Sequence, residues 1–190
     1  EVVHAADRRD PAAKCAADEF AFADGARIAL VGKAAAALAV ASDFEDYLRV
    51  SMNVEAAVTI RPGSAERCAV MASLDEGLAA RQYRVDVSDD GVRIAAKDER
   101  ALAQAFYHLE DLMNLREGPF LKHGSETRRS RFAVRMTHSG YGNDIFPDEH
   151  LSQMAHYGMT AILVFLDDID KTKAQEYQDL KALIRRAAKY

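Results

Sequence analysis

Residues 81–96 read Arg-Gln-Tyr-Arg-Val-Asp-Val-Ser-Asp-Asp-Gly-Val-Arg-Ile-Ala-Ala, and they carry the clearest secondary-structure pattern in the first part of the chain. Tyr83, Val85 and Val87 alternate with the charged residues Arg84 and Asp86. The turn sequence Asp-Asp-Gly at 89–91 then separates two strand-like runs, which is typical of a β-hairpin. The alternation predicts a hairpin with one face on a core and the other in water.

The segments around this hairpin complete one domain. Asp98 is placed to cap a helix whose apolar residues recur at helical spacing until Gly118 and Pro119 end it. Before the hairpin, residues 33–52 are mostly helix formers and residues 56–61 are β-branched. Two apolar runs flank Asp24-Gly25, which predicts a further hairpin over residues 20–31. The pattern predicts an α+β domain over residues 1–121, with an antiparallel sheet and helices packed on one face.

A polar segment follows, and we interpret residues 122–130 as a linker. It contains a basic cluster formed by Arg128, Arg129 and, just beyond it, Arg131. Such a cluster can bind phosphate or act as a targeting signal, but three arginines in a polar stretch are more typical of a solvated linker.

Beyond the linker, strands and helices alternate. Residues 132–138 are predicted to form a strand, Pro147 is expected to open a helix that Gly158 closes, and residues 172–190 are predicted to form a second helix. Between the helices, Thr160–Leu166 is a continuous apolar run, as in a parallel strand buried on both faces. Residues 131–190 are therefore expected to be the first two βα units of a (β/α)8 TIM barrel that is truncated at Tyr190. An incomplete barrel of this kind is expected to self-associate through its uncovered strands.

Composition excludes several classes of protein. Hydrophobic residues make up 49% of the chain and charged residues 29%, which is ordinary globular composition. The net charge of −5 argues against a general nucleic-acid binder. Cys15 and Cys68 are too few for a disulfide framework or a structural zinc site, and no apolar run is long enough to span a membrane. Residues 1–4 lack the features of a signal peptide, and no cofactor or metal is predicted.

Three segments resemble a known family. Tyr83–Val87, Gly91–Ala96 and Ala105–Leu115 are similar to the small α+β domain that precedes the catalytic barrel in glycoside hydrolase family 20, the β-N-acetylhexosaminidases. Family 84 carries a similar domain. His108 stands where family 20 has glycine, and Arg131-Phe-Ala-Val-Arg135 is similar to the family's Arg-Phe-x-x-Arg-Gly.

The sequence departs from the family at positions near its active site. Gly140 stands where family 20 has an aspartate at the end of the first barrel strand. Residues 160–168 replace both histidines of the family motif Asn-x-x-His-x-His-Leu-Thr-Asp-Asp with apolar residues. The family's catalytic Asp-Glu pair lies on the fourth barrel strand, so no catalytic residue is assigned between Glu1 and Tyr190.

Candidate substrate-binding residues lie near the ends of the two expected barrel strands, where barrel active sites form. The resemblance implies that Arg135 hydrogen-bonds sugar hydroxyls, although a buried Arg–carboxylate pair is an equal alternative. His138 could contact substrate or be structural. Asp168 matches a family aspartate, and with Asp167 and Asp170 it could bind sugar, coordinate a cation or cap a helix. The predicted substrate-binding set is Arg135, His138 and Asp168.

The resemblance implies a secreted or periplasmic parent protein that hydrolyses N-acetylhexosamine-containing glycans. In this family the 2-acetamido oxygen of the substrate attacks the anomeric carbon, and the configuration is retained. The chain by itself is expected to be inactive. Two alternatives stay open: a non-catalytic carbohydrate-binding or interaction module, and a barrel hydrolase for another sugar such as a uronic acid.

Overall fold

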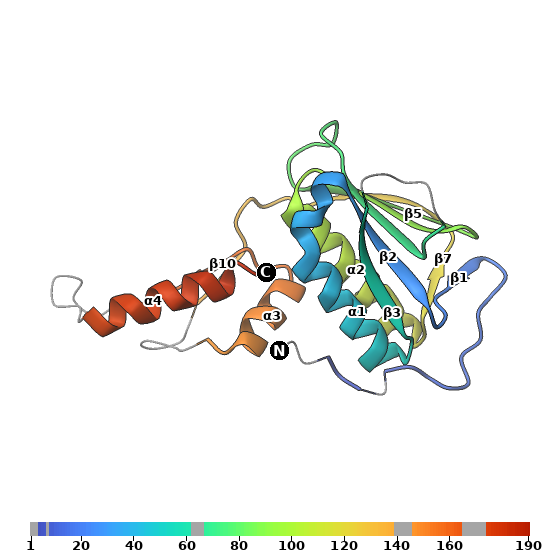
Figure 1. The fold of residues 1–190 in the computed structure, drawn as a ribbon, viewed down its shortest axis with the longest axis horizontal. Coiled ribbons are helices and arrows are strands. Elements are labelled where there is room, and N and C mark those ends of the chain that lie inside the picture. Colours follow the sequence, from blue (N-terminus) through green and yellow to red (C-terminus); the bar gives the residue numbers. More distant parts are fainter. Residues whose placement is uncertain (1–3, 7, 62–66, 139–145, 165–173) are drawn as a thin grey trace. The chain divides into compact units, whose positions relative to one another are not determined.

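The computed structural model describes residues 4–6, 8–61, 67–138, 146–164 and 174–190. It divides into two compact units, which we call the sheet unit (His4–Arg131) and the βαβα unit (Phe132–Tyr190). Figure 1 shows the elements of both units in order along the chain.

A six-stranded mixed sheet forms the centre of the sheet unit. Its strand order is β3 (Ala56–Arg61), β2 (Ala26–Val31), β4 (Val70–Leu74), β6 (Gly91–Ala96), β5 (Gln82–Ser88), β8 (Gly124–Arg129). The hairpin predicted from residues 81–96 is confirmed, with Val85 opposite Ile94 in an antiparallel pair. The expected antiparallel sheet is wrong in its other half, because β3, β2, β4 and β6 run parallel to one another. The helix between β2 and β3 supplies the crossover that parallel neighbours require.

The hairpin predicted around Asp24-Gly25 is also wrong. Gly25 does make a turn, with φ 83°, but the strands on its two sides join different sheets. β1 (Glu19–Ala21) pairs with β7 (Phe120–Lys122), whereas β2 enters the large sheet between β3 and β4. β2 is almost fully buried, and a buried strand needs a partner on each side to satisfy its backbone groups.

Two helices cover one face of this sheet. After a short 3-10 turn, η1 (Gly32–Ala37), α1 (Leu38–Met52) packs beside α2 (Glu99–Arg116), as Figure 1 shows. The predicted cap of α2 is confirmed, because the Asp98 side chain accepts a hydrogen bond from the Ala101 N–H at 2.8 Å. At the centre of the core, the rings of Phe44 and Phe106 lie 5.2 Å apart. Apolar burial against the helices therefore holds this face of the sheet.

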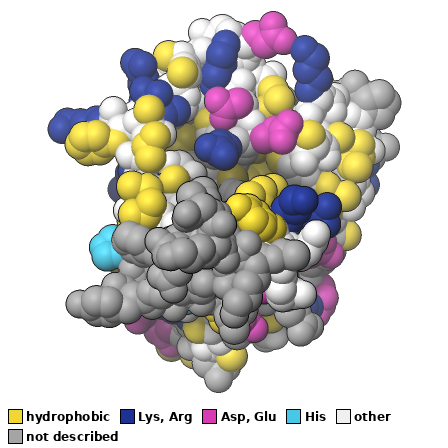
Figure 2. Space-filling view, turned by 90° about the vertical axis from the view of Figure 1, so that its left-hand side faces the viewer, with side chains coloured by type: hydrophobic (Ala, Val, Ile, Leu, Met, Phe, Trp, Pro, Cys, Tyr) yellow, Lys and Arg dark blue, Asp and Glu magenta, His cyan; other side chains and the backbone are white. Residues whose placement is uncertain are grey.

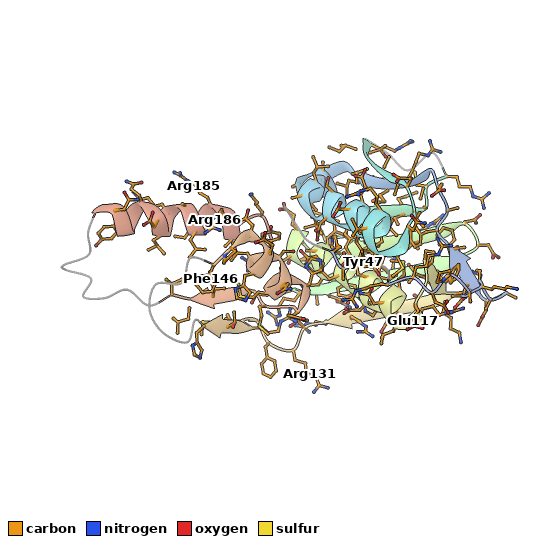
Figure 3. All side chains as sticks on the ribbon, turned by 90° about the horizontal axis from the view of Figure 1, so that it is seen from below. Tyr47, Glu117, Arg131, Phe146, Arg185 and Arg186 are labelled. Carbon is orange, nitrogen blue, oxygen red and sulfur yellow. The ribbon has the colours of Figure 1, made fainter. Side chains whose placement is uncertain are left out.

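A tyrosine labelled in Figure 3 joins the two helices. The hydroxyl of Tyr47 on α1 donates to the Glu110 carbonyl at 3.1 Å, and it lies 2.9 Å from the Asn114 side-chain oxygen on α2. Burial raises the pKa of the Tyr47 phenol well above its usual range, so the hydroxyl keeps its proton and remains a donor.

The segment interpreted as a linker contains a strand. Residues 124–129 form β8, which pairs with β5 over six residues, with Val85 opposite Glu126. All six of its residues are exposed, as expected for a strand at the edge of the sheet. The segment reads as polar because its side chains are exposed, although the backbone groups on one side of the strand pair with β5.

An ion pair ties the start of the sheet unit to the end of α2. The Arg116 guanidinium donates to the two carboxylate oxygens of Glu19 at 2.7 and 3.2 Å, and the Ala16 N–H donates to the same carboxylate at 2.8 Å. The Glu19 side chain is only 9% exposed. The hydrogen bond from Arg116, together with that from Ala16, lowers the pKa of Glu19 below its usual range.

We expect this pair to make stability pH-dependent. A carboxyl with a lowered folded-state pKa stabilises the fold above its unfolded pKa of about 4.3, and this contribution disappears as pH falls through the folded value. Glu19→Gln should therefore destabilise the protein at pH 7, and the difference from the native protein should narrow below about pH 4.3. Urea unfolding at pH 7, 5, 4 and 3 checks this. Exposed Glu55→Gln is the control, and a Glu19 effect that stays constant with pH would contradict the assignment.

The βαβα unit contains two short parallel strands and two helices. β9 (Met136–His138) pairs with β10 (Ala161–Leu163), and α3 (Asp148–His156) and α4 (Ala174–Ala187) follow the strands in order. The predicted parallel pairing is confirmed. A small core of Phe146, Leu151 and Leu183 joins the helices, and Ile162 packs against it.

A basic side chain labelled in Figure 3 fixes α4 to the start of α3. The Arg186 guanidinium donates to the Phe146 carbonyl at 2.7 Å and to the Asp148 carboxylate at 2.9 Å. The hydrogen bond from Arg186 lowers the pKa of Asp148. Asp148 also lies in the first turn of α3, where a negative charge is favourable.

Candidate functional site

The carboxyl ends of β9 and β10 lie at the same edge of the βαβα unit. The register places His138, the last residue of β9, directly opposite Leu163, the last residue of β10. Side chains alternate along a strand, so Met136, His138 and Leu163 share one face and Ile162 lies on the other. Because Ile162 packs against the helix core, His138 is on the face that points away from that core, and its side chain is exposed.

Arg135 lies at the opposite end of β9. Its backbone is fixed by Thr160, whose hydroxyl accepts from the Arg135 N–H at 3.1 Å and whose N–H donates to the Arg135 carbonyl at 2.8 Å. Arg135 is half-buried. A separation of three residues corresponds to about 10 Å along a strand and to opposite faces. The two described members of the predicted substrate-binding set, Arg135 and His138, are therefore not brought together.

The third member of the set, Asp168, lies outside the described residues. So do Asp167 and Asp170, and the loop that contains Gly140. The described part of this edge therefore consists of His138, Leu163 and Val164.

Sequence reasoning missed a polar pair in the sheet unit. His108 on α2 is 8% exposed, and its Nε2 lies 3.0 Å from a carboxylate oxygen of Glu126 on β8. Burial opposes ionisation of Glu126, but hydrogen bonds from Arg128 and His108 outweigh it and lower the pKa of this carboxyl. The available signal was a histidine among the buried positions of an amphipathic helix. The pair fixes the edge strand to α2, where the family 20 glycine could make no such contact.

Exposed apolar side chains are common in the βαβα unit. The large hydrophobic residues with more than a third of their surface exposed are Phe132, Val134, Met136, Tyr157, Leu163, Tyr177 and Ile184. Figure 2 shows several groups of hydrophobic side chains on the side of the molecule that it faces. None of the helices in the described ranges is both long and apolar enough to cross a membrane.

Comparison with solved structures identifies the fold. The GH20 β-N-acetylhexosaminidase from Streptomyces coelicolor A3(2) superimposes with a TM-score of 0.74 and 20% identity, covering 96% of this chain and 44% of that chain. A mutant Streptomyces plicatus β-hexosaminidase in complex with its product GlcNAc gives a TM-score of 0.73 at 20% identity, with the same coverage of both chains. CpGH84D gives 0.64 at 11% identity, covering 93% of this chain and 34% of that chain.

Comparison of sequences finds no counterpart. No protein-family model matches this sequence, and no curated protein matches it. The chain spans less than half the length of the solved structures just described. At this level of identity the match concerns the fold, and it extends through both units of the chain because it covers 96% of the residues. The chain therefore has an α+β fold that matches a fragment of the GH20 β-N-acetylhexosaminidase structures.

Proposed function

We propose that this chain is part of a glycoside hydrolase that acts on N-acetylhexosamine-containing glycans outside the cytoplasm. The observation that carries the proposal is the match over 96% of the chain to hexosaminidase structures, one of which holds GlcNAc. The sheet unit would support the enzyme, and the βαβα unit would begin its TIM barrel. The exposed face of β9 and β10 fits a strand pair that is covered by further strands or by a second copy.

The proposed substrate contacts lie at the carboxyl edge of β9 and β10, where barrel enzymes bind their substrates. His138 is exposed at this edge, and Asp168 follows β10 in the sequence. Arg135 would serve as a rigid fork of hydrogen-bond donors for sugar hydroxyls. Because Arg135 lies at the other end of β9 from His138, this role requires a substrate that reaches beyond the carboxyl edge, and the alternative role is a buried pair with a carboxylate.

The proposed reaction uses the 2-acetamido oxygen of the substrate as nucleophile at the anomeric carbon. A carboxylic acid donates its proton to the leaving glycosidic oxygen as that bond breaks. A second carboxylate orients the acetamido group, and water then opens the cyclic intermediate. Both acids would come from beyond residues 1–190, so the chain alone would bind sugar without hydrolysing it.

A specific observation favours a non-catalytic alternative. Leu163 stands at the position of the first histidine of the family 20 motif, and it lies directly opposite His138. An apolar residue there cannot replace the hydrogen bonds of an imidazole. A protein with leucine in place of this histidine could bind carbohydrate without cleaving it, or it could cleave a different sugar.

A hydrolysis assay tests the proposal. The full-length protein that contains this chain should release nitrophenol from 4-nitrophenyl N-acetyl-β-D-glucosaminide or the galactosaminide, whereas the 190-residue chain should not. Arg135→Met in the full-length protein should lower kcat/KM by about 10–100-fold if the guanidinium binds substrate, which corresponds to the loss of one charge-assisted hydrogen bond.

The other outcomes separate the alternatives. Calorimetric binding of N-acetylglucosamine oligosaccharides without turnover would support the binding module and overturn the hydrolase. Turnover of a uronic acid glycan instead would assign another sugar. An Arg135→Met variant that loses thermal stability but keeps its kcat/KM would assign that residue to the buried pair.

A further inference from the structure

The face of the large sheet that is not covered by α1 and α2 is strongly basic. We call it the open face and define its charged residues within the six strands as Arg27, Arg61, Arg84, Arg93, Arg129 and Asp86. The structure describes every residue of these six strands, and within them Asp86 is the only carboxylate on this face. A chain with a net charge of −5 thus carries five arginines and one acid on one side of its sheet.

The strand register shows that these arginines are spread across the sheet. Arg61 lies on the edge strand β3 and Arg129 on the opposite edge strand β8. Arg93 and Arg84 lie on the neighbouring strands β6 and β5 between them. With strands about 4.8 Å apart, the distance from β3 to β8 across the sheet is about 24 Å. A ligand that contacts arginines on both edge strands must therefore be long and must cross the strands.

The single acid does not neutralise the face. Asp86 lies directly opposite Arg93, and the Arg84 guanidinium donates to its carboxylate at 3.0 Å. The Ser125 hydroxyl donates to its other oxygen. Arg93, Arg84 and Arg129 are all exposed. Arg84 is paired with Asp86, and Arg129 donates to the Ala80 carbonyl at 3.3 Å, an acceptor that leaves its charge uncompensated.

Most side chains in the middle of the open face are small, and Met71 and Val31 are the larger apolar ones. Ala29 and Thr59 lie opposite each other, and Ser73 lies opposite Ala95. No aromatic residue of the six strands points to this side, so the face offers no platform on which nucleobases can stack. Charge and hydrogen bonding are therefore the main interactions that the face offers, and guanidinium groups match carboxylate and sulfate geometry.

We propose that the open face binds an anionic polysaccharide, a glycan that carries carboxylate or sulfate groups along its length. The choice of a glycan rests on the proposed function, whereas the negative charge of the ligand follows from the arginines alone. A surface of this kind would hold the protein on an acidic glycan.

Binding by the 190-residue chain tests this without any hydrolysis step. The chain should bind heparin and polygalacturonate in calorimetry, should not bind neutral dextran, and should bind more weakly as salt is raised. Arg93→Gln with Arg129→Gln should weaken binding by at least about tenfold and reduce the slope of log affinity against log salt by about two. Arg93→Lys with Arg129→Lys keeps the charge and should retain most of the affinity.

A matched control removes the same charge elsewhere. Arg100→Gln with Lys14→Gln, both exposed and outside the six strands, should leave the affinity within about twofold. Equal losses in the two glutamine variants, or no binding to either polyanion, would overturn the proposal. Tighter binding of poly(U) than of the glycans would assign a nucleic acid instead. None of these experiments measures hydrolysis, so their outcomes do not depend on whether the protein is a glycosidase.

Discussion

Phe106→Ala is expected to lower the free energy of unfolding by about 3–5 kcal/mol, because it removes a large buried ring from a close-packed core. Phe106 has no exposed surface, and its ring lies 5.2 Å from that of Phe44 on the facing helix. The loss combines the transfer free energy of the ring with the cost of the cavity that α1 and the sheet cannot fully close. Phe44 would also lose an aromatic contact.

Urea unfolding followed by far-ultraviolet circular dichroism measures this change. Leu115→Ala on the same helix is the matched control, because Leu115 is 83% exposed and its truncation should change stability by less than about 0.5 kcal/mol. Phe106→Leu should fall between the two, since it retains part of the apolar volume. A loss below about 1 kcal/mol for Phe106→Ala would show that α1 and α2 do not pack as the structure has them.

Gly91→Ala is expected to cost about 2–6 kcal/mol, the sum of backbone strain of about 1–3 kcal/mol and overpacking of about 1–3 kcal/mol. Gly91 has φ 123°, which side chains with a Cβ rarely adopt. A Cβ at this position would lie 2.8 Å from the Cys68 carbonyl oxygen and 2.9 Å from that of Ala69. These oxygens belong to the backbone at the start of β4, so neither can move without disturbing the sheet.

Gly25→Ala distinguishes the cost of backbone strain from the cost of overpacking. Gly25 also has a positive φ, 83°, but a Cβ there would meet nothing within 4 Å. Its replacement should therefore cost only the conformational term of about 1–2 kcal/mol. Thermal unfolding of both variants under the same conditions gives the comparison. Equal costs at the two positions would mean that β4 does not approach the hairpin of β5 and β6 as closely as described.

Local patterns in the sequence were sufficient for the elements that depend on near neighbours. The β5–β6 hairpin is confirmed because a short turn and alternating residues determine a pair that is close in sequence. The cap at Asp98 is confirmed for the same reason, since capping involves residues three positions apart.

Pairing between strands that are distant in the sequence could not be predicted from local patterns. Asp24-Gly25 is a good turn sequence, yet β1 and β2 go to separate sheets because the partners of each are far along the chain. β8 cannot be predicted from the sequence, because a fully exposed edge strand whose one contact with a helix is polar carries no apolar alternation. Only its backbone bonds to β5 reveal it.

The candidate site also has features that the sequence predicts and features that only the structure shows. The alternating strands and helices after residue 131 predicted that the ends of two parallel strands meet, and the register of β9 and β10 confirms this. The separation of Arg135 from His138 needed the positions of both residues on β9. The open face is not evident in the sequence, because its five arginines come from five different strands.

Local sequence patterns are enough to predict the helices, the β5–β6 hairpin and the alternation of strands and helices after residue 131, since each depends on residues close together in the sequence. The order and direction of the six strands, and the gathering of basic residues on one face, are seen only in the tertiary structure. The physical reason is that strand partners are chosen by burial and by backbone hydrogen bonds between distant segments, and neither is encoded in a local window of sequence.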